Sequence, residues 1–328
     1  MAFLHIITDN ILPLILFVVI GYLMDRRFQL NVASLTKLTF YLVLPCFIFY
    51  SIYSAELDMN LVNVFLFCCF QMFLLGAAGV LIGKLRGFTP GKTEAFKNGT
   101  MFSNNGNIGV ALIALIFTNA PYGTDTNAPY LAEALAVSTM TLVQMNMTLN
   151  TIGLYQAGKG KLTPMDSIRV ILHMPVLYTL FAVFTIKYIG FDMTATPLWP
   201  VFQNCANALV AIVMMALGMQ IHRSRISFGD VDAWIGCVLR LAGAPLLAAA
   251  LIFLWNAFGT GFSNVTSQVI LIMSSVPSAV NSVLYAVEFK NCEDFATELV
   301  MMSTFVSCVT MTLVIYAARL LFPLPMLG

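Results

Sequence analysis

Long apolar runs separated by short polar connections follow one another along the whole chain. A helix needs about 20 predominantly apolar residues to cross the hydrocarbon core of a bilayer. Ten runs approach or exceed this length, at residues 7–24, 35–53, 61–83, 96–117, 130–154, 168–189, 198–221, 233–258, 264–287 and 296–322. The pattern predicts an all-α polytopic membrane protein with ten transmembrane helices, the first of which is a retained span rather than a cleaved signal.

Two of the runs carry polar and helix-breaking residues in their middle. Residues 102–109 read FSNNGNIG, and residues 274–281 read SSVPSAVN. Glycine, asparagine and proline lower helix stability, and irregular backbone survives at membrane depth only where it packs against protein or lines a cavity. We therefore expect the fourth and ninth helices to break at these places. Such a pair is typical of a transporter's binding site, whereas two closely packed kinked helices are the simpler alternative.

Weak internal matches favour a division of the chain into residues 1–160 and 161–328. The two breaks occupy corresponding positions, and Glu133–Thr139 (EALAVST) in the fifth run resembles Glu298–Thr304 (ELVMMST) in the tenth. Because each half has an odd number of spans, the second half would enter the membrane with the opposite orientation. We therefore predict two inverted five-helix repeats whose broken helices 4 and 9 cross near the bilayer midplane.

Lysine and arginine are distributed unevenly between the two sides of this predicted topology. Most of the 16 basic residues follow odd-numbered runs: Arg26, Arg27, Lys37, Lys84, Arg86, Lys92, Lys97, Lys159, Lys161, Arg169, Arg223, Arg225 and Lys290. Because cytoplasmic loops carry an excess of Lys and Arg, we expect these connections to be cytoplasmic and both termini to lie on the extracytoplasmic side. The membrane would be the plasma membrane, which is the inner membrane in a bacterium.

The composition excludes several classes of function. Hydrophobic residues form 59% of the chain and charged residues only 9%, which leaves almost no room for a soluble domain. A net charge of +1 gives no electrostatic signal for nucleic acid. The 7 cysteines show no metal-ligand spacing, and the sequence contains no Ser/His/Asp constellation or phosphate-binding Gly-x-x-x-x-Gly-Lys motif. We therefore predict a protein that is not an enzyme and uses no metal or cofactor.

The two breaks supply the leading candidates for a substrate site. A broken helix exposes backbone N–H groups at the start of its second half, and together with the positive end of the helix dipole these groups suit an anion. Asparagine amides add donors without a fixed charge, so that no costly buried lysine is needed. The candidate substrate-binding residues are Asn104, Asn105, Gly106 and Asn107, with Pro277, Ser278 and Asn281 as the opposite wall.

Other polar residues inside the runs are candidates that also have simpler explanations. Gln144 in the fifth run, with Asn146 and Asn150, adds a polar face, and hydrogen bonding between helices is the alternative for the two asparagines. Arg240 in the eighth run is a candidate for a coupling or charge role, unless its side chain extends to the membrane surface. His173 is a candidate proton carrier, unless it packs as a neutral side chain.

Several motifs together resemble those of the auxin efflux carrier family. They are Leu44-Pro45-Cys46, Asn104-Asn105-Gly106-Asn107-Ile108-Gly109, Leu217-Gly218-Met219, Arg240-Leu-Ala-Gly-Ala-Pro245 and Pro277-Ser278-Ala279-Val280-Asn281. Each motif is weak alone, but their order and spacing are specific and extend over nearly the whole chain. The long hydrophilic loop of many plant members is missing between the fifth and sixth runs. The chain is therefore similar to the compact prokaryotic type, whose members include transporters of malate and malonate.

The resemblance implies a fold and a transport mode. The fold is similar to that of the bile-acid sodium symporters, with a scaffold of spans 1, 2, 6 and 7, a mobile core of spans 3–5 and 8–10, and elevator-type movement in a homodimer. The matching pocket positions are Gln144 and the wall from Pro45 to Ile48. The sodium symporters place an acidic residue at the second crossing, whereas residues 274–282 carry no carboxylate. This difference argues against a sodium site of that type and leaves proton or sodium coupling open.

We therefore expect a secondary transporter of a small organic anion. The substrate would be a carboxylate such as malate, malonate or an auxin-like acid, and the partners would be this small molecule and membrane lipid. A membrane sensor of the same fold, which binds a ligand without moving it, is the alternative from a different functional class. Flux under an imposed gradient separates the two.

Overall fold

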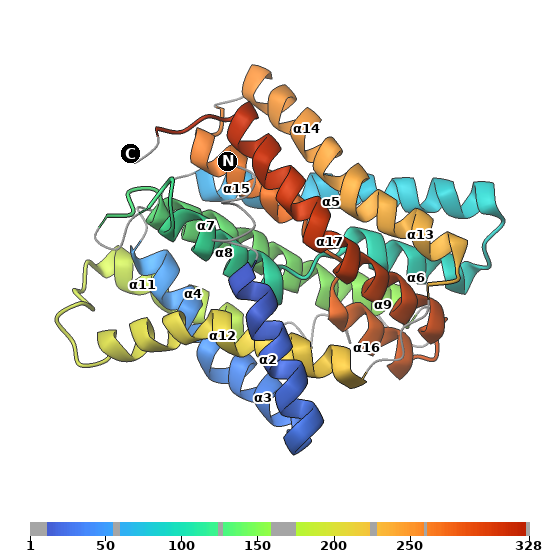
Figure 1. Ribbon diagram of the computed structural model, residues 1–328. Helices are drawn as coiled ribbons and strands as arrows, with labels where there is room; N and C mark the ends of the chain where they lie inside the picture. The colour runs from blue at the N-terminus through green and yellow to red at the C-terminus, as the bar shows by residue number, and fades with distance from the viewer. Residues whose placement is uncertain are drawn as a thin grey trace.

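The computed structural model describes residues 12–54, 60–123, 127–158, 175–223, 228–258 and 261–325. Within these ranges the chain is helical apart from short connections, and an isolated β-bridge pairs Ser103 with Ser278. Inclined helices pack against one another and are joined by short connections (Figure 1).

The helices, with η marking π-helical turns, are α2 (Leu12–Phe28), α3 (Val32–Leu38), η2 (Thr39–Val43), α4 (Leu44–Ser54), α5 (Asn60–Arg86), α6 (Pro90–Met101), η3 (Asn105–Gly109), α7 (Val110–Thr118), α8 (Leu131–Thr148), η4 (Leu149–Gly153), α9 (Leu154–Ala157), α11 (Pro175–Ile189), α12 (Trp199–Arg223), α13 (Val231–Val238), η5 (Leu239–Gly243), α14 (Ala244–Phe258), α15 (Asn264–Ser274), α16 (Val280–Glu288) and α17 (Glu293–Leu321).

The predicted class of an all-helical membrane protein is confirmed. In the part of the chain that the structure describes, four continuous helices could each cross a membrane by length and composition: Asn60–Arg86, Trp199–Arg223, Val231–Phe258 and Glu293–Leu321. The remaining apolar helices are shorter. Helical structure is present in the described part of each predicted run, whereas the division into two inverted repeats of five spans stays a prediction.

Two of the π-helical turns precede prolines. η2 lies directly before the turn that contains Pro45, and η5 directly before the turn that contains Pro245. A proline inside a helix lacks an N–H and its ring collides with the carbonyl four residues earlier, so a wider turn relieves the clash. η5 is also the segment that carries the buried Arg240.

The helices form two groups. In Figure 1, α2, α3, α4, α11 and α12 occupy the lower left, while α5, α6, α13, α14 and α17 occupy the upper right. In the first group α2 meets α12 with backbone against backbone. A Cβ atom built on Gly21 would lie 2.1 Å from the carbonyl oxygen of Met215, and one on Gly218 would lie 1.9 Å from that of Val18. Small residues allow such close approach between membrane helices.

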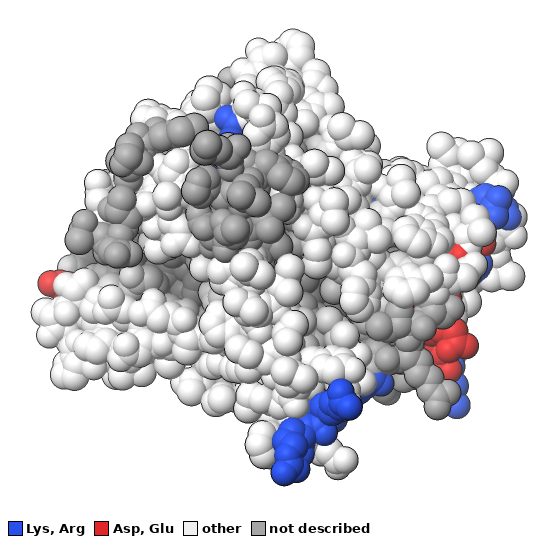
Figure 2. Space-filling model, in the orientation of Figure 1, with Lys and Arg blue, Asp and Glu red and all other residues white. Residues whose placement is uncertain are grey.

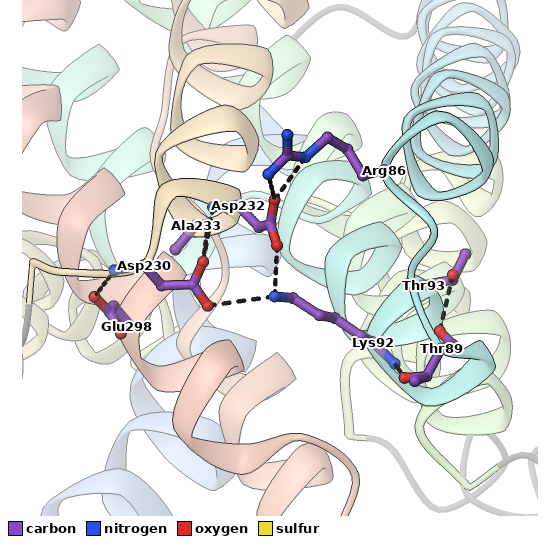
Figure 3. Close-up of polar contacts among 8 residues, drawn as sticks. All are labelled: Arg86, Thr89, Lys92, Thr93, Asp230, Asp232, Ala233 and Glu298. Carbon is purple, nitrogen blue, oxygen red and sulfur yellow. Dashed lines mark hydrogen bonds and ion pairs between the residues drawn. The ribbon is translucent and has the colours of Figure 1, made fainter.

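A charged cluster at one end of the second group holds four of its helices together (Figure 3). Asp232 binds Arg86 of α5 at 2.9 Å and the Nζ of Lys92 in α6 at 2.6 Å. Asp230 caps α13 by accepting from the backbone N–H of Asp232 at 2.7 Å, while its own N–H donates to Glu298 of α17 at 2.8 Å. The side chains remain partly accessible, so the cluster orients these helix ends more than it stabilises them.

Replacement of Gly218 by alanine should loosen the contact between α2 and α12. The new methyl would meet the Val18 carbonyl, a backbone atom that yields little, and overpacking of this kind costs about 1–3 kcal/mol. The thermal unfolding temperature in detergent should fall. Gly243→Ala is the matched control, because the new methyl there meets the end of the flexible Leu239 side chain at 2.9 Å. Equal unfolding temperatures for the two variants would contradict the close contact.

Candidate functional site

The two broken helices meet each other at the positions that the sequence predicts. α6 ends at Met101 and helical structure resumes at Asn105, while α15 ends at Ser274 and α16 begins at Val280. Between these ends the two segments run antiparallel. The N–H of Asn104 donates to the carbonyl of Pro277 at 2.7 Å, and the N–H of Ala279 donates to that of Phe102 at 2.9 Å. Both predicted interruptions are confirmed, and we call this place the crossing.

The side chains of the crossing satisfy backbone groups that the breaks set free. Ser278 donates through its hydroxyl to the carbonyl of Gly99 at 2.6 Å, and its N–H donates to the hydroxyl of Ser303 in α17 at 3.2 Å. Pro277 cannot donate and therefore ends the hydrogen bonding of α15. Buried backbone polar groups left unpaired are costly, so these contacts explain why the irregular stretch is stable at this depth.

Arg240 closes the C-terminal ends of both helices that stop at the crossing. Its guanidinium is 2% exposed and donates from Nη1 to the Thr100 carbonyl at 3.1 Å, at the end of α6. It also donates from Nη2 to the Ser274 carbonyl at 2.6 Å and from Nε to the Val276 carbonyl at 3.0 Å, at the end of α15. The side chain is wholly internal, so the alternative in which it extends to the membrane surface is wrong.

The helix ends at the crossing carry opposite partial charges. Each C-terminus is equivalent to about −0.5 elementary charge and each N-terminus to about +0.5. The positive charge of Arg240 is of the size needed to offset the two C-terminal ends that it contacts. The N-terminal ends of the η3–α7 segment and of α16 then remain as a positive region, with no anionic partner among the described residues. This region is suited to a single negative group.

A cavity of about 40 Å³ lies at these N-terminal ends. We call it the crossing cavity; its lining comprises Thr39, Leu44, Ser103, Asn104, Gly106, Asn107, Leu142, Met145, Asn146, Leu149, Ala279, Val280 and Asn281. Among the described residues, no acidic side chain belongs to this lining. One water occupies about 10–15 Å³ on this measure, so the space suits a group as large as a carboxylate.

Two asparagines of the crossing cavity have amide nitrogens without a hydrogen-bond partner. They are the Nδ2 atoms of Asn104 and Asn146, both buried. Most buried polar side-chain atoms in folded proteins find a partner, and an exception calls for an explanation. Both asparagines line the crossing cavity beside two helix N-termini, and an acceptor-rich ligand there would supply the partner that their NH₂ groups lack.

A second cavity, also of about 40 Å³, adjoins Arg240. We call it the arginine cavity. It is lined by Cys68, Gln71, Met72, Leu75, Met101, Ser103, Asn105, Thr141, Gln144, Met145, Arg240, Ile270, Met273 and Ser274. Gln71 donates to the carbonyl of Ala244 at 3.0 Å and Asn105 accepts from Ser103 at 2.8 Å, so these side chains already have partners. Ser103 and Met145 line both cavities.

The structure divides the predicted site residues into several groups. Asn104, Gly106, Asn107 and Asn281 line the crossing cavity, whereas Asn105, Gln144 and Arg240 line the arginine cavity. Pro277 and Ser278 form the crossing itself through the contacts above. Neither Pro45 nor Ile48 belongs to either lining, although the adjacent Leu44 does. His173 lies outside the described residues.

Two asparagines that sequence alone left ambiguous, Asn146 in α8 and Asn150 in η4, have different roles. Asn150 accepts a hydrogen bond from the Tyr285 hydroxyl of α16, which is the predicted alternative of bonding between helices. Asn146 instead lines the crossing cavity with an unpaired amide. Sequence analysis did not single out Thr39 and Thr141. An isolated threonine gives no signal, because only the packing of its helix decides whether it faces a cavity.

An all-helical chain with apolar spans and two broken helices that meet at a polar cavity belongs, as a class, to the membrane transporters. The comparison with known proteins agrees. The model of the family described as membrane transport protein matches residues 6–315, and the chain belongs to this family, which is that of the auxin efflux carriers. The resemblance found in the motifs is confirmed, and the family is one of transporters rather than enzymes.

A relative from Methanothermobacter thermautotrophicus supports the same assignment. It is described as an uncharacterized transporter and is 23% identical over 312 residues, which are 93% of this chain and 96% of the relative. The likeness therefore extends over both chains almost from end to end.

Arg240→Met should destabilise the protein strongly. The variant leaves the carbonyls of Thr100, Ser274 and Val276 without their donor, and each unsatisfied buried group costs about 1–3 kcal/mol. We expect a total loss of at least about 3 kcal/mol, measured by thermal or denaturant unfolding in detergent. Arg27→Met, at an exposed position, is the control. A variant as stable as this control would exclude Arg240 as the group that joins the two helix ends.

Proposed function

We propose that the protein is a secondary transporter of a small organic anion, bound by its carboxylate in the crossing cavity. The single observation that carries the proposal is the pair of unpaired amide groups of Asn104 and Asn146 beside two helix N-termini. A carboxylate offers acceptor oxygens to these amides and a negative charge to the helix dipoles. Malate, malonate and an auxin-like acid are the candidates, and the small cavity favours the smaller acids.

Movement of an elevator type is the mechanism that best suits this arrangement. The walls of the crossing cavity come from both proposed units, because Thr39 and Leu44 belong to η2 and α4, while Asn107, Asn146 and Asn281 belong to η3, α8 and α16. A ligand held between two groups is released to one side when one group slides past the other. We propose that α2, α4, α11 and α12 form the scaffold and that α5–α8 and α13–α17 form the moving core.

The remaining features of the proposal come from the family resemblance and the charge pattern. They are assembly as a homodimer, a position in the plasma membrane and an extracytoplasmic location of both termini. The coupling ion would be a proton or sodium. Among the described residues no group of three or more His, Cys, Asp and Glu side chains is arranged to hold a metal ion.

Asn104→Asp tests the charge of the ligand at nearly constant side-chain shape. A carboxylate in this position would repel an anionic substrate by about 4 kcal/mol at 4 Å with an effective dielectric constant of 20. We therefore expect uptake of labelled malate or malonate into proteoliposomes to fall by at least about 100-fold. Asn256→Asp is the matched control, because the exposed Asn256 uses only its side-chain oxygen, which accepts from Phe262 at 2.8 Å.

Three outcomes distinguish the candidate functions. Loss of flux in Asn104→Asp with normal flux in the control supports an anion transporter. Normal flux in both variants excludes the crossing cavity as the anion site. Ligand binding without any flux under an imposed gradient favours the sensor.

Binding of carboxylic acids should also raise the unfolding temperature. A ligand that binds only the folded state adds about 2.7 kcal/mol of stability at 100 times its dissociation constant. Malonate should stabilise the protein and the neutral malonamide should not, because the proposed site selects negative charge. Repetition with and without sodium, and at several pH values, identifies the coupling ion. Equal stabilisation by the acid and the amide would contradict an anion site.

A further inference from the structure

A large apolar groove lies apart from the crossing cavity, between the two helix groups. Its volume is about 580 Å³, and it is lined by Ile15, Val18, Val19, Tyr22, Ile108, Met214, Leu217, Ile221, His222, Thr304, Phe305, Ser307, Cys308 and Met311. The lining comes from α2 and α12 on one side and from α17 on the other, with Ile108 of η3 contributing. Ligand pockets of small molecules have volumes of about 300–1,000 Å³, so the groove is large enough for an organic ligand.

The serine and the threonine of the groove, and one ring nitrogen of its histidine, already have hydrogen-bond partners within the protein. Ser307 donates to the carbonyl of Thr304 at 2.7 Å, and Thr304 donates to that of Val300 at 2.8 Å, both within α17. His222 is held by Asp25 through Nδ1 at 2.7 Å. Hydroxyls that bond within their own helix leave an effectively apolar wall. The groove therefore favours a hydrocarbon chain over a carboxylate.

One end of the groove is basic. Tyr22 lines the groove, and Arg26 lies four residues further along α2, on the same helix face. Arg26, Arg27 and Arg223 are exposed, while the nearby Asp25 is buried and already paired with Arg223 at 2.6 Å. Figure 2 shows basic side chains at the lower edge of the molecule, where α2 ends.

We propose that the groove binds one acyl chain of an anionic phospholipid, with its phosphate at Arg26 and Arg27. Apolar walls ending in exposed arginines match a hydrocarbon chain ending in a negative headgroup, and juxtamembrane basic clusters attract such lipids. The exposed fractions of Val19 (45%) and Phe305 (41%) show that the groove is open at its rim. This site is independent of the proposed anion transport, although Ile108 places the chain against the broken helix.

Retention of lipid by the purified protein tests the site. Protein in detergent is mixed with equal amounts of phosphatidylglycerol and phosphatidylcholine, and the bound lipid is measured by native mass spectrometry. We expect one phosphatidylglycerol per chain to be retained in preference to phosphatidylcholine. Each arginine contributes roughly fivefold to this preference, so R26Q/R27Q should reduce it roughly 25-fold. Lys84→Gln, which removes one basic charge at an exposed position in α5, is the control and should leave the preference unchanged.

A second pair of variants tests the groove by volume. Cys308→Phe places a ring in the groove and should abolish retention, whereas Val309→Phe adds the same ring at an exposed position outside the groove lining and should not. Size-exclusion profiles establish that each variant is folded. Equal retention of both lipids, or equal retention in Cys308→Phe and Val309→Phe, would overturn the proposal and indicate only unspecific surrounding lipid.

Discussion

The three hydrogen bonds of Arg240 to the ends of α6 and α15 are the interaction on which the architecture depends. Two helices that stop inside a membrane leave carbonyl groups that no water can satisfy. One guanidinium satisfies carbonyls from both ends and brings a full positive charge to two negative helix termini. A buried arginine is usually expensive. Here its five fixed N–H donors and its charge match what the two helix ends lack.

This arrangement separates positive and negative helix ends and so creates the site. Arg240 binds the carbonyl groups at the C-terminal helix ends. The N-terminal helix ends, with their free N–H groups, face the crossing cavity. Unpaired amides of Asn104 and Asn146 reinforce the same polarity. An anion can therefore be held by dipoles and neutral amides, and an empty site leaves no unpaired side-chain charge behind. A carrier that must return without its cargo benefits from such a neutral lining.

The helix packing around the crossing supports the proposed movement of one helix group against the other. α2 and α12 touch through their backbones at Gly21 and Gly218, which favours a rigid unit. The charged cluster of Arg86, Lys92, Asp230 and Asp232 joins the ends of helices in the other group. Between these two units lie the crossing cavity and the larger apolar groove. Contacts are thus dense within each unit and leave open volume where the units meet.

Much of this molecule could be derived from the order of its residues. The apolar runs predicted helices because a bilayer demands length and hydrophobicity from a spanning segment, and the motifs FSNNGNIG and SSVPSAVN predicted both interruptions because proline, glycine and asparagine weaken helices. The family also followed from the motifs. Local chemistry of this kind acts within one segment, so it can be recognised without knowledge of the neighbours.

The partners of individual polar side chains, in contrast, depended on the packed helices. From the sequence, the Arg240 side chain could extend to the membrane surface or lie inside the protein. Only the packing of α6 and α15 beside it decides that it lies inside. Asn146 and Asn150 are one helical turn apart, yet one faces the cavity and the other bonds to Tyr285. Pro45 and Ile48 likewise do not line the cavities, whereas Leu44 does. Such distinctions arise from contacts between segments more than 100 residues apart in several cases, and no local pattern encodes them.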